Sequence, residues 1–205
     1  MRSKYCLLGI VCSFALSGAD QPTEIVEIEA GSASFEASTN MPGVEVKGAS
    51  NAIAGHAVLS REAGGLVLEQ VRVTLPIKSL STGMKVRDEH MRKYIFTAAD
   101  GHVPDLEFAA GKTACQPAAG AGEFVCAVSG DLAMAGTPRK FAMKLSVKES
   151  SGAFHASGNA VVRLSDYGIA CPSQFGVSTK NEVKLHLALI GRPKTAAPSA
   201  TGSGQ

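Results

Sequence analysis

The densest group of ionisable side chains in this sequence lies between Ser79 and Phe96, in the segment SLSTGMKVRDEHMRKYIF. The group comprises Lys85, Arg87, Asp88, Glu89, His90, Arg92 and Lys93. Imidazoles and carboxylates often transfer protons in enzymes, so Asp88 and His90 are the first candidates for catalysis. Residues two apart on a helix do not face each other, and these two therefore cannot form a hydrogen-bonded dyad.

No other part of the sequence completes a catalytic site. The remaining histidines are scattered, and by strand alternation His155 and His186 point outward. The sequence lacks the GxSxG, HExxH, P-loop and GxGxxG patterns of hydrolases, zinc proteases and nucleotide-binding proteins. Its cysteines lack the paired CxxC spacing of a metal site. We therefore predict no catalytic residue, no metal and no cofactor.

A solvent-exposed helix face accounts for most of the charges in this segment. Asp88 with Arg92, and Glu89 with Lys93, are spaced i,i+4 with the acid first. Each such pair stabilises a helix by about 0.3–0.5 kcal/mol. Arg87 and Asp88 are less well explained, because they adjoin the apolar side of the predicted helix.

That apolar side gives the helix a predicted role as a lid. Ser81 or Thr82 can cap a helix that starts just after the Thr-Gly pair. Met84, Met91 and Ile95 then fall near one face. Methionine packs against varied shapes, so the helix suits an adaptable cover on an apolar pocket.

The two ends of the chain are not expected to join the folded domain. Residues 1–19 read as a cleaved signal peptide: Arg2 and Lys4 precede a short apolar run, and Ser17 and Ala19 occupy the small positions before the cleavage site. The apolar run is too short to span a bilayer, so no transmembrane segment is expected in the mature chain. Residues 192–205 are rich in Pro, Ala, Gly and Ser and are predicted to be a disordered tail. Residues 20–191 form one predicted domain.

The charge balance of the mature chain disfavours two kinds of partner. The sequence has 20 Lys and Arg against 18 Asp and Glu. Loss of Arg2 and Lys4 with the signal peptide leaves 18 of each sign. Nucleic-acid binders usually carry a basic surplus, so we expect no nucleic acid as partner, and strong attraction to an anionic membrane surface is disfavoured for the same reason.

Three cysteines remain after the predicted cleavage, in a compartment where disulfides persist. Cys115 and Cys126 flank the loop QPAAGAGEFV between two strand-like runs. We predict a disulfide between them, which would stabilise the fold by about 2–4 kcal/mol. Cys171 is then unpaired, and two readings stay open for it: a free buried thiol or an intermolecular link.

Period-two alternation of apolar and polar residues is the strongest structural pattern in the sequence. It predicts about eight strands, each with one apolar face. The runs lie near residues 24–36, 44–60, 66–77, 105–112, 123–136, 140–148, 152–164 and 183–189. Antiparallel strands of this kind hide their apolar faces by stacking or by closing into a barrel. Long strands, with Gly130 and Gly158 on the inner face to allow curvature, favour the barrel.

The predicted inner face carries unusually small residues. Gly130, Ala156, Gly158 and Ala160 share it, and the chain has no Trp. An eight-stranded barrel whose interior is not filled by side chains can hold one small ligand. Two readings stay open: an apolar ligand pocket, or a packed barrel in which small residues lie opposite large ones such as Phe124.

Several motifs in order give the chain a resemblance to a known family. They are Thr82-Gly83, Arg87-Asp88, His90, Phe96, VPDLEF (103–108), GDLAMAGTPRKFAMKLSV (130–147), LSDYGI (164–169) and NEVKLHLAL (181–189). Together they resemble the YceI-like family over about residues 32–191. The resemblance implies an all-β, single antiparallel eight-stranded lipocalin-like barrel with one short helix capping an end. It further implies a polyisoprenoid or similar lipid inside, with its polar head near the mouth, and a possible homodimer.

The resemblance also assigns the lining of the cavity. The implied ligand-binding residues are Met84, Arg87, Met91, Tyr94, Phe96, Phe108, Leu132, Met134, Phe141, Met143, Tyr167 and Phe175. Two roles are open for Arg87: approach to a phosphate or other polar head group, or pairing with Asp88 to fix the lid. Tyr167 is equally compatible with plain core.

The sequence thus predicts an exported, periplasmic, non-enzymatic protein that holds a long apolar lipid for transport, storage or sequestration. Two alternatives stay open. One is a lipid-modifying enzyme that uses the same cavity, with Asp88, His90 or Tyr167 as acid or base. The other is a structural or partner-binding module whose barrel is filled.

Overall fold

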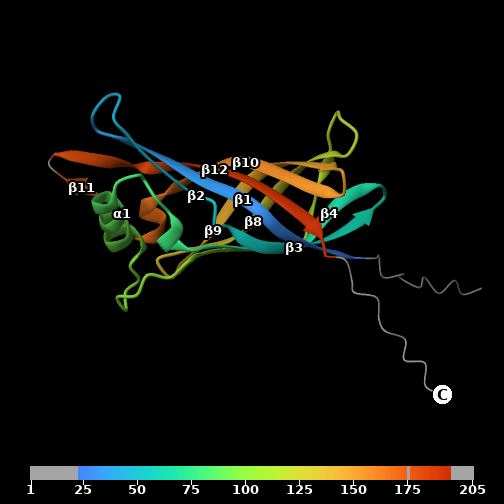
Figure 1. Cartoon of the computed structure of the whole chain (residues 1–205), viewed down its shortest axis with the longest axis horizontal. Helices are drawn as coiled ribbons and strands as arrows, with labels where there is room; N and C mark the ends of the chain where they lie inside the picture. Colours follow the sequence, from blue (N-terminus) through green and yellow to red (C-terminus); the bar gives the residue numbers. More distant parts are fainter. Residues whose placement is uncertain (1–22, 175, 195–205) are drawn as a thin grey trace, which may run out of the picture.

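The computed structural model describes residues 23–174 and 176–194 (Figure 1). The predicted signal peptide and most of the predicted tail lie outside the described residues, and so does Phe175. The strands are β1 (Glu24–Thr39), β2 (Glu45–Ser50), β3 (Ala54–Glu62), β4 (Gly65–Leu75), β5 (Leu106–Ala110), β6 (Thr113–Ala114), β7 (Gln116–Pro117), β8 (Glu123–Met134), β9 (Thr137–Ser150), β10 (Ala153–Arg163), β11 (Ser173–Gln174) and β12 (Val177–Pro193). The last of these ends two residues beyond Gly191, where the sequence placed the end of the domain.

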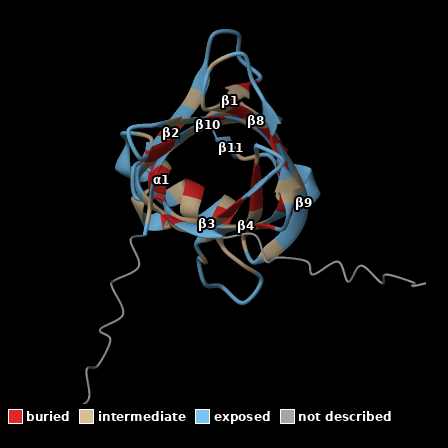
Figure 2. Cartoon of the chain, turned by 90° about the vertical axis from the view of Figure 1, so that its right-hand side faces the viewer, coloured by how far each residue is buried: buried red, intermediate tan, exposed pale blue. Residues whose placement is uncertain are grey.

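Eight of these strands close into an antiparallel barrel, as predicted. The order β12-β10-β9-β8-β5-β4-β3-β1 follows the sheet, and pairing of β1 with β12 closes it. Figure 2 shows the ring of strands end-on. Strand β1 pairs with β12 along most of its length, with β3 through Glu24–Glu27, and with β2 through Ala33–Ser38.

The alternation seen in the sequence sets which side chains enter the barrel. In β8, Phe124, Cys126 and Val128 are buried, whereas the intervening Ala127 and Ser129 are exposed. The hairpin partner β9 keeps this register from end to end, with Cys126 opposite Leu145. Gly130 lies opposite Ala110 where β5 pairs with β8, and a Cβ there would overlap the carbonyl oxygen of Ala109, so only glycine permits this close approach.

One of the predicted strands forms two separate strands in the structure. The run expected over residues 44–60 breaks at residues 51–53, between β2 and β3. The Ser50 hydroxyl accepts a hydrogen bond from the Ala52 amide at 3.1 Å, which turns the chain. As a result β2 pairs with the far half of β1 and β3 with its near half.

The helical part of the chain lies across one end of the barrel (Figure 1). It consists of α1 (Lys85–Met91), which continues as a π-helical turn η2 (Arg92–Phe96). We call this segment, Lys85–Phe96, the lid. The short 3-10 helix η1 (Ile77–Ser79) contacts η2, and a second one, η3 (Leu164–Tyr167), packs Leu164 and Tyr167 in the same buried cluster as Met91 and Phe96.

The buried apolar side chains form two separate clusters. The base cluster lies at the end remote from the lid and contains Val26, Leu59, Leu66, Leu68, Ala110, Cys115, Phe124, Cys126, Val128, Val147 and Phe154. The lid cluster contains Ile77, Leu80, Met91, Phe96, Met134, Val162, Leu164 and Tyr167. The predicted disulfide between Cys115 and Cys126 is present, in the base cluster. Cys171 is a free thiol but is exposed, so the buried reading was wrong.

Candidate functional site: the barrel interior and its lid

Between the two clusters, the inner wall is lined by apolar side chains that are only partly buried. They are Phe108, Leu132, Phe141, Met143, Leu145, Leu185 and Leu187. All of them alternate with exposed or outward-facing neighbours and so point into the barrel. Because they face away from the outer surface, the area that they still expose belongs to the interior. The middle of the barrel is therefore less completely filled than its ends.

Small residues on β10, the strand between β9 and β12, explain why the middle of the barrel is incompletely filled. Gly158 of β10 lies between Leu187 of β12 and Leu145 of β9, and Ala160 lies opposite Leu185. A large side chain at either position would enter the same space. Phe108 and Phe141 meet edge to face nearby, with their ring centroids 5.9 Å apart, and they join the base cluster to the lid cluster.

The lid closes one end of this space with two side chains. Met91 and Phe96 are 7% and 6% exposed, and both belong to the lid cluster. Tyr167, from η3, completes the lid cluster. Burial and the charge of Asp166 raise the pKa of its phenol, and Arg139 opposes them with a smaller effect. Its phenol is therefore neutral at physiological pH, as expected of a core tyrosine.

A single carboxylate holds the lid to the preceding loop. Asp88 is buried, and it accepts hydrogen bonds from the Ser81 hydroxyl at 2.9 Å, the Thr82 amide at 2.7 Å and the Thr82 hydroxyl at 2.5 Å. Burial acts to raise the pKa of this carboxyl, but the hydrogen bonds from Thr82 and Ser81, with the charge of Arg92, outweigh it and lower the pKa below its ordinary value. Asp88 is therefore a charged acceptor, and its bonds are of the stronger, charge-assisted kind.

The loop that donates to Asp88 is itself fixed to the barrel. Ser81 and Ala49 exchange backbone hydrogen bonds of 2.9 and 3.0 Å, and the hydroxyls of Ser50 and Ser79 lie 2.6 Å apart. Gly83 then reverses the chain with a φ of 80°, a conformation that favours glycine. Hydrogen bonds thus link β2 to the loop and the loop to Asp88 without a break.

This arrangement corrects the predicted helix cap. The residue before the helix is Met84, which makes no side-chain capping bond, because Ser81 and Thr82 are instead bonded to Asp88. The ion pairs of the described residues include neither Asp88 with Arg92 nor Glu89 with Lys93. The charged face of the lid is solvated, as expected, but without those pairs.

Of the two roles predicted for Arg87, the pairing with Asp88 is absent among the described residues, and the approach to a polar head group stays a prediction. Its Nη2 donates to the Thr82 carbonyl at 2.7 Å, and no ion pair within the described residues joins it to Asp88. Its Nε is buried without a hydrogen-bond partner in the described part of the chain. One donor at the root of the lid thus remains available.

The other predicted lining residues divide by position. Four are buried in the lid cluster: Met91, Phe96, Met134 and Tyr167. Four are partly buried on the inner wall: Phe108, Leu132, Phe141 and Met143. Met84 and Tyr94 are each 57% exposed and lie on the outside of the lid, so the inward orientation expected of Met84 is wrong, and Tyr94 does not line the interior. The structure adds Leu145, Leu185 and Leu187, whose alternation in the sequence already marked them as inward.

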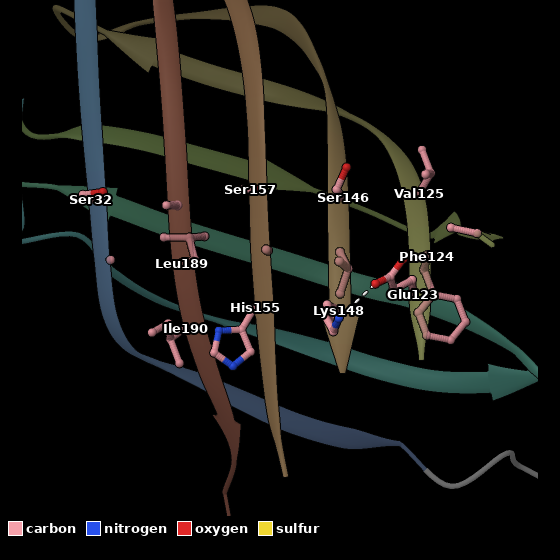
Figure 3. A pocket seen from close by; sticks show the side chains of 15 residues that line it. Ser32, Glu123, Phe124, Val125, Ser146, Lys148, His155, Ser157, Leu189 and Ile190 are labelled. Atoms are coloured by element: carbon pink, nitrogen blue, oxygen red, sulfur yellow. Dashed lines mark hydrogen bonds and ion pairs between the residues drawn. The ribbon is translucent and has the colours of Figure 1, made fainter. Parts of the chain in front are cut away.

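The outer wall carries a shallow recess across five strands (Figure 3). Its volume is about 650 Å³. His155, Lys148 and Glu123 follow one edge, and Ser157 and Ser146 follow the other. Lys148 is paired with Glu123 at 3.0 Å, and the recess holds no buried charge, so we regard the interior as the stronger candidate site.

Two further observations limit the chemistry of the described residues. Within residues 23–174 and 176–194, no three His, Cys, Asp or Glu side chains are grouped so as to hold a metal ion. None of the described helices has the length and apolarity that crossing a bilayer requires.

Comparison with known proteins gives a family match and several similar folds. The family model of the YceI-like domain matches residues 26–190. The fold is similar to a polyisoprenoid binding domain from Saccharophagus degradans, with 17% identity, a TM-score of 0.61, and coverage of 82% of this chain and 98% of that one. It is also similar to BcnA from Burkholderia cenocepacia, with 17% identity, a TM-score of 0.60, and coverage of 78% and 95%.

A third similar structure is the YCEI protein of Campylobacter jejuni, with 16% identity and a TM-score of 0.56; the match covers 77% of this chain and 90% of that one. At these identities the likeness concerns the fold. The search of curated proteins found no match.

Proposed function

The chain belongs to the YceI-like family, and from this premise we propose that it is an exported lipid-binding protein. In this proposal the barrel holds one polyisoprenoid or similar long apolar lipid for transport, storage or sequestration. The observation that carries the proposal is the band of apolar side chains, partly buried yet pointing inward, between the base and lid clusters. Each CH₂ group transferred from water to such a wall contributes about 0.8 kcal/mol, so a long hydrocarbon chain would bind well.

Two further observations support the choice of ligand. One structural neighbour is named a polyisoprenoid binding domain, and that name gives the ligand class that the proposal adopts. The inner wall itself is apolar, with Phe108 and Phe141 at its centre. A branched isoprenoid chain offers methyl groups that pack against such rings and leucines.

The polar end of the lipid belongs at the lid in this proposal. Arg87 lies there with a buried Nε that has no partner in the described chain, and guanidinium groups favour phosphate.

Export to the periplasm rests on the signal peptide predicted over residues 1–19. A homodimer stays a prediction, which sedimentation equilibrium of the purified protein would test.

The proposal is tested by filling the barrel. Ala160→Phe places a ring on the inner wall beside Leu185, whereas Val161→Phe places the same ring outside, at a position that is 54% exposed. Titration with a fluorescent geranylgeranyl analogue should show strong binding to the wild type and Val161→Phe, and at least tenfold weaker binding to Ala160→Phe.

Circular dichroism controls for the fold of both variants. Equal affinity of all three proteins would place the ligand outside the barrel and contradict the proposal. Absence of binding by the wild type, after solvent extraction of any resident lipid, would favour a filled structural module. Turnover of the bound lipid, abolished by Asp88→Asn with binding intact, would favour the enzyme alternative.

A further inference from the structure

The lid end of the molecule exposes most of the large apolar side chains on the surface. Among the described residues, the exposed large hydrophobic side chains near this end are Met41, Val44, Met84, Val86, Tyr94 and Val103. Of the others, Ile25 and Ile190 lie on strands at the base end, and Val161 lies on the outer face of β10, next to Val162 of the lid cluster. Exposed apolar residues scattered singly need no explanation, whereas a group on one face marks an interaction surface.

The segments that carry these residues lie at the same end of the barrel (Figure 1). The β1–β2 turn is joined to the β11–β12 turn by a hydrogen bond from the Asn40 side chain to the Gly176 carbonyl at 3.0 Å. The β11 strand in turn contacts the lid, where His90 Nδ1 and Gln174 Oε1 lie 3.0 Å apart. The turn, the β11 hairpin and the lid thus form one continuous end surface.

On the lid itself the exposed side chains are ordered in two rows. Val86, His90 and Tyr94 are spaced four apart and follow one row; the rings of His90 and Tyr94 are 5.8 Å apart. Lys85, Glu89 and Lys93 form the adjacent row, and Lys93 Nζ lies 5.2 Å from the centre of the Tyr94 ring. An apolar row with a tyrosine beside lysines is the composition of a membrane-interface helix face.

The charges of the lid favour an anionic partner. The segment has four basic residues, Lys85, Arg87, Arg92 and Lys93, against Asp88 and Glu89. The ion pairs of the described chain include none of the four basic residues. Asp88 and Glu89 keep their negative charges, so residues 85–96 carry a net charge of two positive. The balanced charge of the whole chain therefore hides a locally positive lid.

We propose that the lid end docks on an anionic phospholipid membrane surface, with Val86 and Tyr94 in the interface and Lys85 and Lys93 at the head groups. Docking would bring the lid, and the interior behind it, directly to a bilayer. The described chain begins and ends at the opposite end of the barrel from the lid (Figure 1). The surface is distinct from the interior, and docking does not require that a lipid be bound there.

The absence of Trp from the sequence makes a direct test possible. Tyr94→Trp introduces a single fluorophore on the lid, and Val161→Trp introduces one on the side wall, at similarly exposed positions of 57% and 54%. With vesicles of phosphatidylglycerol and phosphatidylcholine, the Tyr94→Trp emission should shift to the blue and be quenched by brominated acyl chains. The Val161→Trp emission should stay unchanged. All variants share the same N-terminal segment, so its contribution cancels.

Charge is tested by a matched pair. Lys85→Gln should weaken vesicle binding roughly fivefold, and Lys144→Gln, an exposed lysine on the wall strand β9, should not. Raising salt from 0.05 to about 0.5 M should weaken binding of the wild type through screening. Equal shifts of both tryptophans, equal binding to pure phosphatidylcholine, or no binding to vesicles would each overturn the proposal. The last result would instead assign this surface to a protein partner.

Failure of this proposal is distinguishable from failure of the proposed lipid carriage. The lid-surface variants leave the inner wall unchanged, so their affinity for the geranylgeranyl analogue should equal that of the wild type. Loss of vesicle docking with unchanged analogue binding separates the two surfaces.

Discussion

At its base the barrel is closed by buried apolar side chains and a disulfide, whereas at the other end it is closed by a lid that polar bonds hold in place. The base cluster contains the Cys115–Cys126 bond and comes entirely from strands and their connections. The lid is attached through Asp88 to Ser81 and Thr82, and through them to β2. Hydrogen bonds can break locally without unfolding a sheet, so we expect the lid end to open before the base does.

The largest expected effect compares one phenylalanine from each end. Phe124 in the base cluster and Phe96 in the lid are both 6% exposed. Phe124→Ala should lower the free energy of unfolding by about 3–5 kcal/mol, since it leaves a cavity in a rigid core. Phe96→Ala should lower it by less, because the lid can loosen around the cavity. Urea unfolding followed by circular dichroism measures both losses.

Hydrogen exchange then locates the effect of Phe96→Ala. We expect faster exchange of the amides in residues 85–96, with strand amides little changed. Equal losses of global stability in the two variants would show that the lid and barrel unfold as one unit.

The second prediction removes the covalent link at the base. The paired substitutions Cys115→Ala and Cys126→Ala should lower the free energy of unfolding by about 2–4 kcal/mol. Both cysteines are buried in the base cluster, so mild reductant should act slowly on the folded wild type. Urea unfolding curves with and without reductant test this prediction. An unchanged unfolding midpoint after verified reduction would show that the disulfide does not stabilise the base.

The third prediction concerns the attachment of the lid. Asp88→Asn keeps the shape of the side chain but replaces one acceptor oxygen with a donor group, which faces the donors of Ser81 and Thr82. The loss should be about 1–3 kcal/mol, concentrated in the lid, and visible as faster exchange in residues 82–92. Glu89→Gln, an exposed neighbour on the same helix, is the matched control and should change little.

The fourth prediction is the pH dependence of that attachment. The folded state lowers the pKa of Asp88, so its contribution is fully present above the pKa of the unfolded chain, about 3.9. It is lost as the pH falls below that value through the lower folded pKa. Urea unfolding of the wild type and Asp88→Asn between pH 6 and pH 2.5 should show the advantage of the wild type shrinking with acid. A constant difference across this range would contradict the lowered pKa.

The smallest effect is expected on the outer wall. Lys148 and Glu123 form a 3.0 Å ion pair beside the recess, but their side chains are 58% and 38% exposed. Lys148→Met should therefore change stability by less than about 1 kcal/mol and leave binding of the prenyl analogue unaltered. A clear loss of analogue binding would draw attention back to the recess as a ligand site.

The sequence could predict the parts of the molecule that depend on the local alternation of apolar and polar residues. The alternation in residues 123–147 predicted the β8–β9 hairpin and its inward face, and the loop flanked by Cys115 and Cys126 predicted the disulfide. The same alternation marked Leu145, Leu185 and Leu187, although the resemblance to the family had drawn attention to aromatic residues and methionines instead.

The lid was harder to predict because its geometry depends on distant contacts. The donors to Asp88 are held in place by pairing of Ser81 with Ala49, 32 residues earlier in the chain, and no local pattern reveals that. Met84 precedes the helix rather than joining its buried face, and Tyr94 continues the exposed row of Val86 and His90. Both side chains are therefore outside, where a helix that included Met84 would have brought it inward.

The central claim is that the space between the two clusters accommodates one long apolar lipid, and native mass spectrometry of the purified protein tests it most directly. We expect a species heavier than the bare chain by the mass of one lipid, which persists in Val161→Phe and disappears in Ala160→Phe. A wild-type protein that is bare after gentle purification, and that gains no mass when incubated with prenyl or acyl lipids, would contradict the claim.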